Sequence, residues 1–402
     1  MHNPKSLIMQ TTKPYLNNLT ALRGIAALLV VVYHCNEGIA QFIDTSHTFW
    51  FKNLYLMVDL FFILSGFIMC YVYENFFLDT TQKNKIATFL KARLARIYPL
   101  HIITLAVCVL FAVITLQMGK REFTGPVSMA VWDFKAIPAH LFLLQSAHIH
   151  KIFTWNVPSW SISAEWFAYL LFPFLVRPFS KFNFTKIFIA ASAILILYAV
   201  LIFYVAPNRA NLFPFFVNKK DLNLNYDWGF ARGILGFVLG MCMYRLYVGN
   251  FLKKIISSGW FFATIVLLYG IYMHLDFNDI AAPILFSLLL LSTAYGNSNL
   301  NSLFSNKILQ KLWLWSFSIY MWHGVIQGLI YSIQAWVLEA APLPGPPPPP
   351  NYMGITNPYI IMVLFTTASI FVGALSYHFI ENPSRVFINN WRKREKDLQQ
   401  SR

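Results

Sequence analysis

The first apolar stretch of the chain, residues 19–41, carries an arginine near its start and a histidine near its end, Arg23 and His34. On an α-helix, eleven residues correspond to about 16 Å along the axis, roughly half the thickness of a bilayer core. The helix would therefore place a fixed cation near one membrane face and a titratable base well toward the other. A histidine in such a place could act as a general base toward a hydroxyl group.

Three further ionisable residues, Asp59, Glu165 and Arg232, fall near the expected outer ends of later apolar stretches. We therefore expect them to share one layer of the membrane with His34. A carboxylate beside His34 would fix its tautomer and stabilise the imidazolium, so we predict that Glu165 or Asp59 joins it in catalysis. The alternative is structural, in which these carboxylates cap helices or pair with Arg232.

Arg232, Trp160 and His323 are the candidate residues for binding an acceptor in the same region. Trp160 and His323 also have a structural alternative. Trp160 could be an interfacial anchor at a helix end, and His323 could pack or form a hydrogen bond between helices.

Two arginines, Arg93 and Arg96, stand at the expected cytoplasmic start of the third apolar helix. Residues three apart lie on one face of a helix. Paired guanidinium groups suit the phosphates of a nucleotide-like donor, and Arg23 would lie near the same membrane face. The alternative is the ordinary positive charge that flanks membrane helices.

The composition indicates a polytopic membrane protein. Of the 402 residues, 57% are hydrophobic and 12% are charged, whereas soluble domains carry about 25% charged residues. The formal net charge of +15 is better explained by positively charged cytoplasmic loops than by nucleic-acid binding. The four cysteines show no metal-binding spacing, so we predict no metal.

These features predict an all-α fold of about ten transmembrane helices, with lipid as the surrounding partner. With the N-terminus in the cytoplasm, most of the 31 Lys and Arg residues face the cytoplasm, so both termini are predicted to lie there. The predicted division is a cytoplasmic segment 1–18, a membrane domain 19–380 and a basic cytoplasmic tail 381–402. The predicted helices are 19–41, 54–74, 93–118, 161–179, 184–206, 228–248, 257–274, 279–296, 312–337 and 357–380.

The chain resembles the acyltransferase-3 family of bacterial membrane acyltransferases, through an ordered series of motifs along nearly its whole length. The motifs are Leu-Thr-Ala-Leu-Arg-Gly from Leu19, Val-Asp-Leu-Phe-Phe from Val58, Arg-Leu-Ala-Arg-Ile-Tyr-Pro from Arg93, Trp-Ser-Ile-Ser-Ala-Glu from Trp160, Arg-Gly-Ile-Leu-Gly from Arg232, Ser-Ile-Tyr-Met-Trp-His from Ser318 and Ile-Glu-Asn-Pro from Ile380. The resemblance implies that His34 and the pair Arg93 and Arg96 are essential, with Arg23 matching the arginine of the first helix.

The resemblance also implies a function. An acyl group, most often acetyl, would pass from cytoplasmic acyl-CoA to a hydroxyl of a surface glycan, such as lipopolysaccharide O-antigen or an exopolysaccharide. The protein would be a stand-alone enzyme of the bacterial inner membrane, as a monomer or a homodimer. Both a ternary complex and an acyl-histidine intermediate fit the sequence. Alternatives are acylation of a secondary metabolite or a lipid-linked small sugar, a small-anion transporter, and a membrane scaffold.

Overall fold

The computed structural model describes residues 16–39, 48–81, 83–117, 131–209, 219–275, 277–296, 303–338 and 357–390, and in these residues it contains helices and no strand. The predicted segment 1–18 and tail 381–402 fall mostly outside them. The α-helices are α1 (Asn17–Gly38), α2 (Met57–Leu78), α3 (Lys85–Gln117), α5 (Ile137–Leu141), α6 (Trp160–Ser180), α7 (Phe184–Val200), α8 (Gly229–Val248), α9 (Lys253–Ile256), α10 (Gly259–Leu275), α11 (Ala281–Tyr295), α13 (Lys307–Leu338) and α14 (Pro358–Ser376). Short 3₁₀ or π segments are η2 (Lys52–Leu56), η4 (Phe134–Ala136), η5 (Val157–Ser159), η6 (Leu201–Val205) and η8 (Tyr377–Glu381).

The predicted all-α class is confirmed for the described part of the chain, and each predicted stretch contains a helix. Six helical segments are long and apolar enough to cross a membrane, which makes the protein a multi-pass membrane protein. They are Asn18–Gly38, Lys52–Leu78, Lys85–Gln117, Phe184–Val205, Gly229–Val248 and Pro358–Asn390. The helices α10 and α11 are apolar but shorter. The number of ten spans and the cytoplasmic side stay predictions.

Several helix boundaries differ from those expected, most of all the start of the third helix and the end of the last. The third helix begins at Lys85, so Arg93 and Arg96 lie more than two turns inside it and not at its start. The extra turns are held because Phe89 is fully buried against the rings of Tyr73 and Phe77. At the other end of the chain, helical backbone continues through η8 to residue 390, beyond the predicted end at 380.

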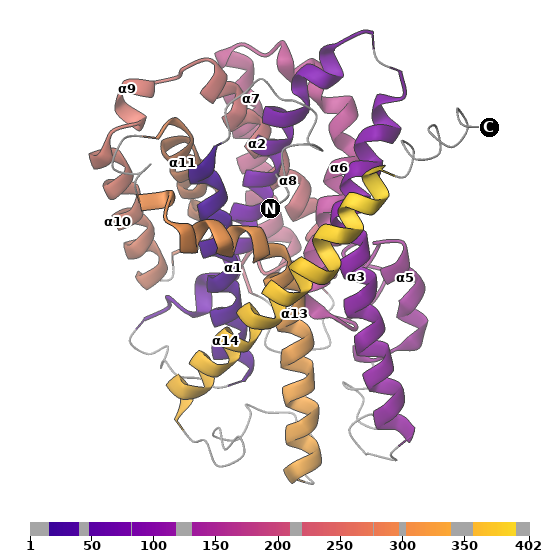
Figure 1. Cartoon of the computed structure of the whole chain (residues 1–402). Helices are drawn as coiled ribbons and strands as arrows, with labels where there is room; N and C mark the ends of the chain where they lie inside the picture. Colours follow the sequence, from indigo (N-terminus) through magenta and orange to yellow (C-terminus); the bar gives the residue numbers. More distant parts are fainter. Residues whose placement is uncertain are drawn as a thin grey trace, which may run out of the picture.

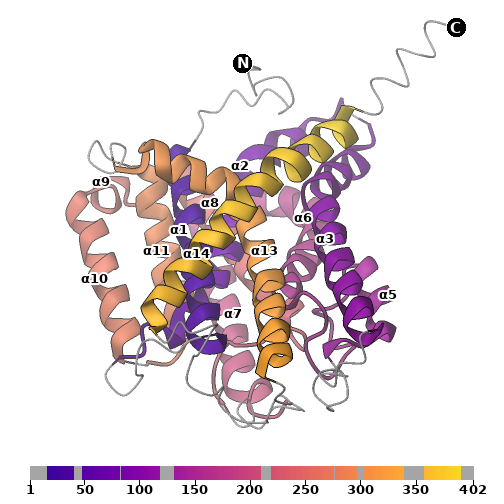
Figure 2. The same ribbon diagram turned by 60° about the horizontal axis from the view of Figure 1, so that its bottom comes forward.

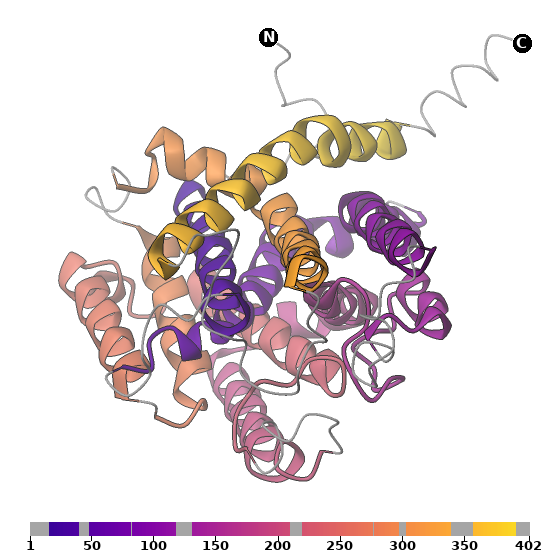
Figure 3. The same ribbon diagram turned by 90° about the horizontal axis from the view of Figure 1, so that it is seen from below.

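The helices form one bundle in which α1 and α13 lie side by side near the middle (Figures 1 and 3). The helix α14, drawn in yellow, runs obliquely across this pair and contacts both (Figure 1). The start of α1 and the described end of the C-terminal helix lie at the same end of the bundle (Figure 2). We call this end the inner end, because the sequence predicts that it faces the cytoplasm.

Two glycines let the backbones of α2 and α8 approach each other closely. A Cβ atom added to Gly66 would lie 1.8 Å from the carbonyl oxygen of Phe237, and one added to Gly240 would lie 2.0 Å from that of Ile63. Small residues allow membrane helices to pack at this distance. The contact fixes the rotation of α2 against α8, which carry Asp59 and Arg232, respectively.

We expect Gly240→Ala to destabilise the protein by about 3 kcal/mol, at the upper end of what overpacking usually costs, because backbone atoms cannot move aside. Thermal unfolding of the purified protein in detergent measures the change. The matched control is Gly270→Ala in α10, where the added atom would lie 3.4 Å from the Trp50 ring, an ordinary contact. Because alanine favours a helix over glycine by about 1 kcal/mol, this control should be neutral or stabilising. Equal melting temperatures for the two variants would contradict the close contact of α2 and α8.

Candidate active site

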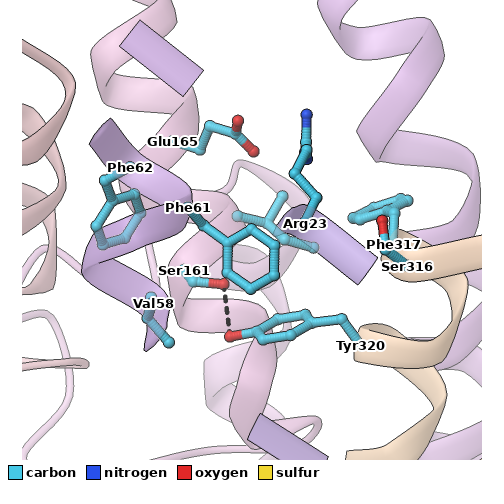
Figure 4. Close-up of a pocket in the computed structure, with 10 residues that line it drawn as sticks. Arg23, Val58, Phe61, Phe62, Ser161, Glu165, Ser316, Phe317 and Tyr320 are labelled. Carbon is cyan, nitrogen blue, oxygen red and sulfur yellow. Dashed lines mark hydrogen bonds between the residues drawn. The ribbon is translucent and has the colours of Figure 1, made fainter. Parts of the chain in front are cut away.

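A small pocket, with a cavity volume of about 50 Å³, lies between α1, α2, α6 and α13 (Figure 4). Its polar lining comprises Arg23, Ser161, Glu165, Ser316 and Tyr320, and much of its wall is aromatic. In Figure 4 the charged ends of Arg23 and Glu165 lie at one end of the pocket, away from the Ser161–Tyr320 hydrogen bond. That bond joins the Ser161 hydroxyl to the Tyr320 hydroxyl over 2.8 Å. The pocket therefore has a charged end, an apolar middle and a hydroxyl-lined end.

The Glu165 carboxylate is held beside Arg93. Its Oε1 accepts hydrogen bonds from the hydroxyls of Ser65 at 2.6 Å and Tyr169 at 2.5 Å. The Arg93 guanidinium donates to the Tyr73 hydroxyl over 2.7 Å and lies 5.8 Å from the centre of the Tyr169 ring. Tyr169 thus connects the two charges. Within the described residues, the hydrogen bonds of Glu165 run to Ser65 and Tyr169, and none runs to His34.

Arg96 has different neighbours from Arg93, although the two are three residues apart. It lies in electrostatic range of the buried Glu381, together with Arg23 and Arg385. Glu381 accepts a hydrogen bond from the Ser318 hydroxyl over 2.8 Å, and the described residues give its other oxygen no partner. Three arginines from α1, α3 and the C-terminal helix therefore surround one carboxylate. Such an excess of positive charge favours an anionic ligand.

Asp59 and Arg232 form a bidentate ion pair in the α2–α8 contact. Arg232 donates from Nε to Oδ1 over 2.9 Å and from Nη2 to Oδ2 over 2.6 Å. The two side chains are 0% and 1% exposed. Arg232 also donates to the carbonyl oxygens of Leu224 and Tyr55, and its guanidinium carbon lies 5.4 Å from the centre of the Trp160 ring. Asp59, Arg232 and Trp160 thus make one buried group, in which Asp59 pairs with Arg232 as the structural alternative for these two residues has it.

His34 is placed with another histidine. Its ring centre lies 4.9 Å from that of His323 on α13, and its carbonyl oxygen accepts a hydrogen bond from Gln327 over 3.2 Å. His323 is fully buried, and neither of its ring nitrogens makes a hydrogen bond of good geometry to a described residue. The Tyr320 ring, on the wall of the pocket, lies 5.4 Å from the His323 ring. A path of adjacent groups therefore leads from the pocket through Tyr320 and His323 to His34.

The nine predicted site residues thus fall into four groups. His34 lies with His323, Asp59 and Trp160 lie with Arg232, Glu165 lies with Arg93, and Arg96 lies near Arg23 and Glu381. The four residues expected in one layer, His34, Asp59, Glu165 and Arg232, do not all contact one another, because depth along a helix does not determine the direction in which a side chain points. In the described part of the chain, no group of three or more His, Cys, Asp or Glu residues is placed to bind a metal ion.

Several residues around the site were not among those predicted. Tyr169 and Ser65 hold Glu165, whereas Ser161 and Tyr320 form the hydroxyl-lined end of the pocket. The sequence did contain signals for them. Ser161 directly follows Trp160, and Tyr320 lies one helical turn before His323. The Ile-Glu-Asn-Pro motif contains Glu381, and Arg385 lies two residues after its proline.

The comparisons with known proteins point to one family. The model of the acyltransferase-3 family, described as an acyltransferase domain, matches residues 16–378. The acyltransferase MdmB of Streptomyces mycarofaciens is 28% identical over 330 residues, which are 77% of this chain and 79% of that protein. The O-acetyltransferase OatA of Staphylococcus aureus is 23% identical over 406 residues, and the peptidoglycan O-acetyltransferase OatA of Listeria monocytogenes is 22% identical over 414 residues.

The two OatA matches cover 92% and 94% of this chain, but the chain spans only 57% of the length of each OatA protein. No solved structure matches the chain. Because the family match covers nearly all of the described helices, it includes every residue of the site except Glu381 and Arg385. The chain therefore belongs to the acyltransferase-3 family, and the protein is a multi-pass membrane acyltransferase.

Proposed function

We propose that the protein is an O-acetyltransferase of the bacterial inner membrane that moves an acetyl group from acetyl-CoA to a hydroxyl of a cell-surface glycan. The observation that carries this proposal is the pocket, whose charged end holds Arg23 and whose other end meets the histidine pair through Tyr320. A donor with phosphates at one end and a thioester at the other suits such a pocket. The family membership supports acyl transfer as the reaction.

The donor would enter from the inner end of the bundle. Arg96 and Arg23 would bind its phosphates, because guanidinium groups bind phosphate through paired, charge-assisted hydrogen bonds. Arg93 would contribute a second positive charge at the pocket, held in place by Tyr73 and Tyr169. The apolar middle of the pocket would take the pantetheine arm. This places the thioester toward Tyr320 and the histidines.

The acceptor would approach His34 from the opposite, outer side. His34 would take the proton of the acceptor hydroxyl, and the oxygen would then attack the thioester carbonyl carbon. A sugar hydroxyl is supported as the acceptor because two relatives are named O-acetyltransferases, one of them a peptidoglycan O-acetyltransferase. Peptidoglycan, lipopolysaccharide O-antigen and exopolysaccharide are the glycans to compare.

The proposal is tested with membrane vesicles that contain the protein, incubated with acetyl-CoA labelled in the acetyl group. We expect label in the glycan fraction, and we expect mass spectrometry of surface glycans to show one additional acetyl group per modified unit only in cells that make the protein. Vesicles that transfer no label from acetyl-CoA, together with unchanged glycan masses, would refute the proposal. Label in a small lipid-soluble product would instead favour a secondary metabolite or a lipid-linked sugar as the acceptor.

Arg96→Ala is expected to raise the KM for acetyl-CoA by tenfold or more, with a smaller effect on kcat. A hydrogen bond to a charged group contributes about 1.5–3 kcal/mol, and Arg96 has no hydrogen bond or ion pair to another described residue that the substitution would break. The control is Arg177→Ala in α6, whose guanidinium donates to the Phe77 carbonyl and takes no part in the group around Glu381. An unchanged KM in the Arg96 variant would exclude it from donor binding.

A further inference from the structure

We propose that His323 is a second catalytic residue, which donates a proton to the thiolate of CoA as it leaves, while His34 removes the proton from the acceptor hydroxyl. This role rests on the proposed function. It differs from the sequence-based prediction that His323 binds the acceptor. It follows from where the structure places the second imidazole, between the first one and the wall of the pocket.

The position of His323 carries the inference. His323 lies one turn after Tyr320 on α13, so both side chains share a face of that helix. Its ring lies 5.4 Å from the Tyr320 ring on the pocket side and 4.9 Å from the His34 ring on the other side. It is therefore the titratable group that stands between the site assigned to the thioester and the base assigned to the acceptor.

The hydrogen bonding of the His323 ring nitrogens also supports a role in proton transfer. The side chain is 0% exposed, and neither ring nitrogen makes a hydrogen bond of good geometry to a described residue; the backbone carbonyls of Ile319 and Tyr320, one turn earlier on the same helix, approach the ring. Leaving a buried polar group without a partner costs about 1–3 kcal/mol. A structural histidine would normally recover this free energy from a neighbouring helix. A histidine that receives and releases a proton during catalysis needs a nitrogen kept available for its substrate.

The reaction balances with these two residues alone. The acceptor O–H bond breaks and its proton moves to His34, while the acceptor oxygen bonds to the thioester carbon and the carbon–sulfur bond breaks. The proton on His34 passes to the adjacent His323, and His323 delivers it to the sulfur of CoA. Both imidazoles end neutral, so the pair carries at most one positive charge at any stage. The products are the acetyl ester and the free thiol of CoA.

The test compares acetyl-CoA with its selenoester, in which selenium replaces the thioester sulfur and the rest of the donor is unchanged. A selenolate is a much weaker base than a thiolate and leaves without a proton. We expect His323→Gln to lower kcat about 100-fold or more with acetyl-CoA, the usual scale of general acid catalysis. With the selenoester, the loss should be less than about fivefold. His34→Gln should lose activity with both donors, because both need the acceptor to be deprotonated.

A His323→Gln variant that loses activity equally with both donors would overturn the proposal, since a structural or acceptor-binding role does not depend on the leaving group. An undiminished rate with acetyl-CoA would overturn it as well. The control is His274→Gln, an exposed histidine at the end of α10 that is bonded to Thr48, and its rates should be unchanged. Transfer from neither donor by the wild-type protein would refute the proposed function itself.

A measurement on the wild-type protein covers the case in which the His323 variant does not fold. The rate in H₂O divided by the rate in D₂O should be larger with acetyl-CoA than with the selenoester, because only the thiolate needs a proton in the step that releases it. Equal ratios for the two donors would overturn the role of His323.

Discussion

His34→Ala is expected to abolish acetyl transfer, with kcat reduced by about 100-fold to 10,000-fold, the range that positioned general bases supply. The reduction should be seen at saturating acetyl-CoA. The Arg23 and Arg96 side chains assigned to the donor are not in contact with His34 in the described structure, so KM for the donor should change little. A loss in kcat without a loss of donor affinity is the signature of a group that acts in the chemical step.

The same substitution should leave the protein folded. The hydrogen bond from Gln327 goes to the backbone carbonyl of His34, which alanine retains. The ring of His34 has no hydrogen bond to a described residue, so its removal leaves no partner unpaired. Thermal unfolding in detergent should therefore match the wild-type protein within a few degrees. A folded His34→Ala variant with full activity would end the assignment of His34 as the base, and His274→Ala serves as the histidine control.

The sequence predicted the helices well because long apolar stretches in a membrane have few alternatives to the α-helix. It placed Arg23 and His34 on one helix, and it named two of the residues that line the pocket, Arg23 and Glu165. It did not predict the start of α3, because residues 85–92 include charged side chains and so do not read as part of a membrane span. Their helix is stabilised by the buried ring of Phe89, and this burial depends on contacts with other helices.

The partners of the ionisable groups could not be predicted from depth alone. Counting residues gives the height of a side chain on its helix, whereas the rotation of the helix decides which neighbour it meets. Asp59 meets Arg232 because Gly66 and Gly240 bring the backbones of α2 and α8 together. Glycines recur every three or four residues in α8, at 233, 236 and 240. This spacing is a signal for close helix packing that could have indicated the pairing.

The two arginines of α3 illustrate the same limit. Residues three apart on a helix differ in direction by about 60°, and the long side chain of arginine increases the separation at its charged end. Arg93 turns to the aromatic rings of Tyr73 and Tyr169, whereas Arg96 turns to Glu381. Their joint role in donor binding therefore requires the pocket and the group around Glu381 to bind different parts of one molecule.

Arg232→Leu is expected to destabilise the protein by about 3–5 kcal/mol, because it leaves the buried Asp59 carboxylate without its counter-charge. Replacing both members, as Asp59→Leu with Arg232→Met, should restore most of this stability, since hydrophobic residues of similar volume can replace a buried ion pair at little cost. Thermal unfolding of the three variants in detergent measures the effect. A single variant as stable as the wild-type protein would contradict the buried pair.

The matched control is the second ion pair between the same two helices, Arg245 with Glu74, whose nearest atoms are 3.1 Å apart. Arg245→Leu should cost less, because Arg245 is 18% exposed and Glu74 keeps a hydrogen bond from Tyr244 over 2.7 Å. Acetyl transfer by the double variant of Asp59 and Arg232 then separates the two predicted roles of this pair. A folded and active double variant would show that the pair serves α2–α8 packing alone. A folded but inactive one would support the roles predicted from the sequence, which are catalysis for Asp59 and acceptor binding for Arg232.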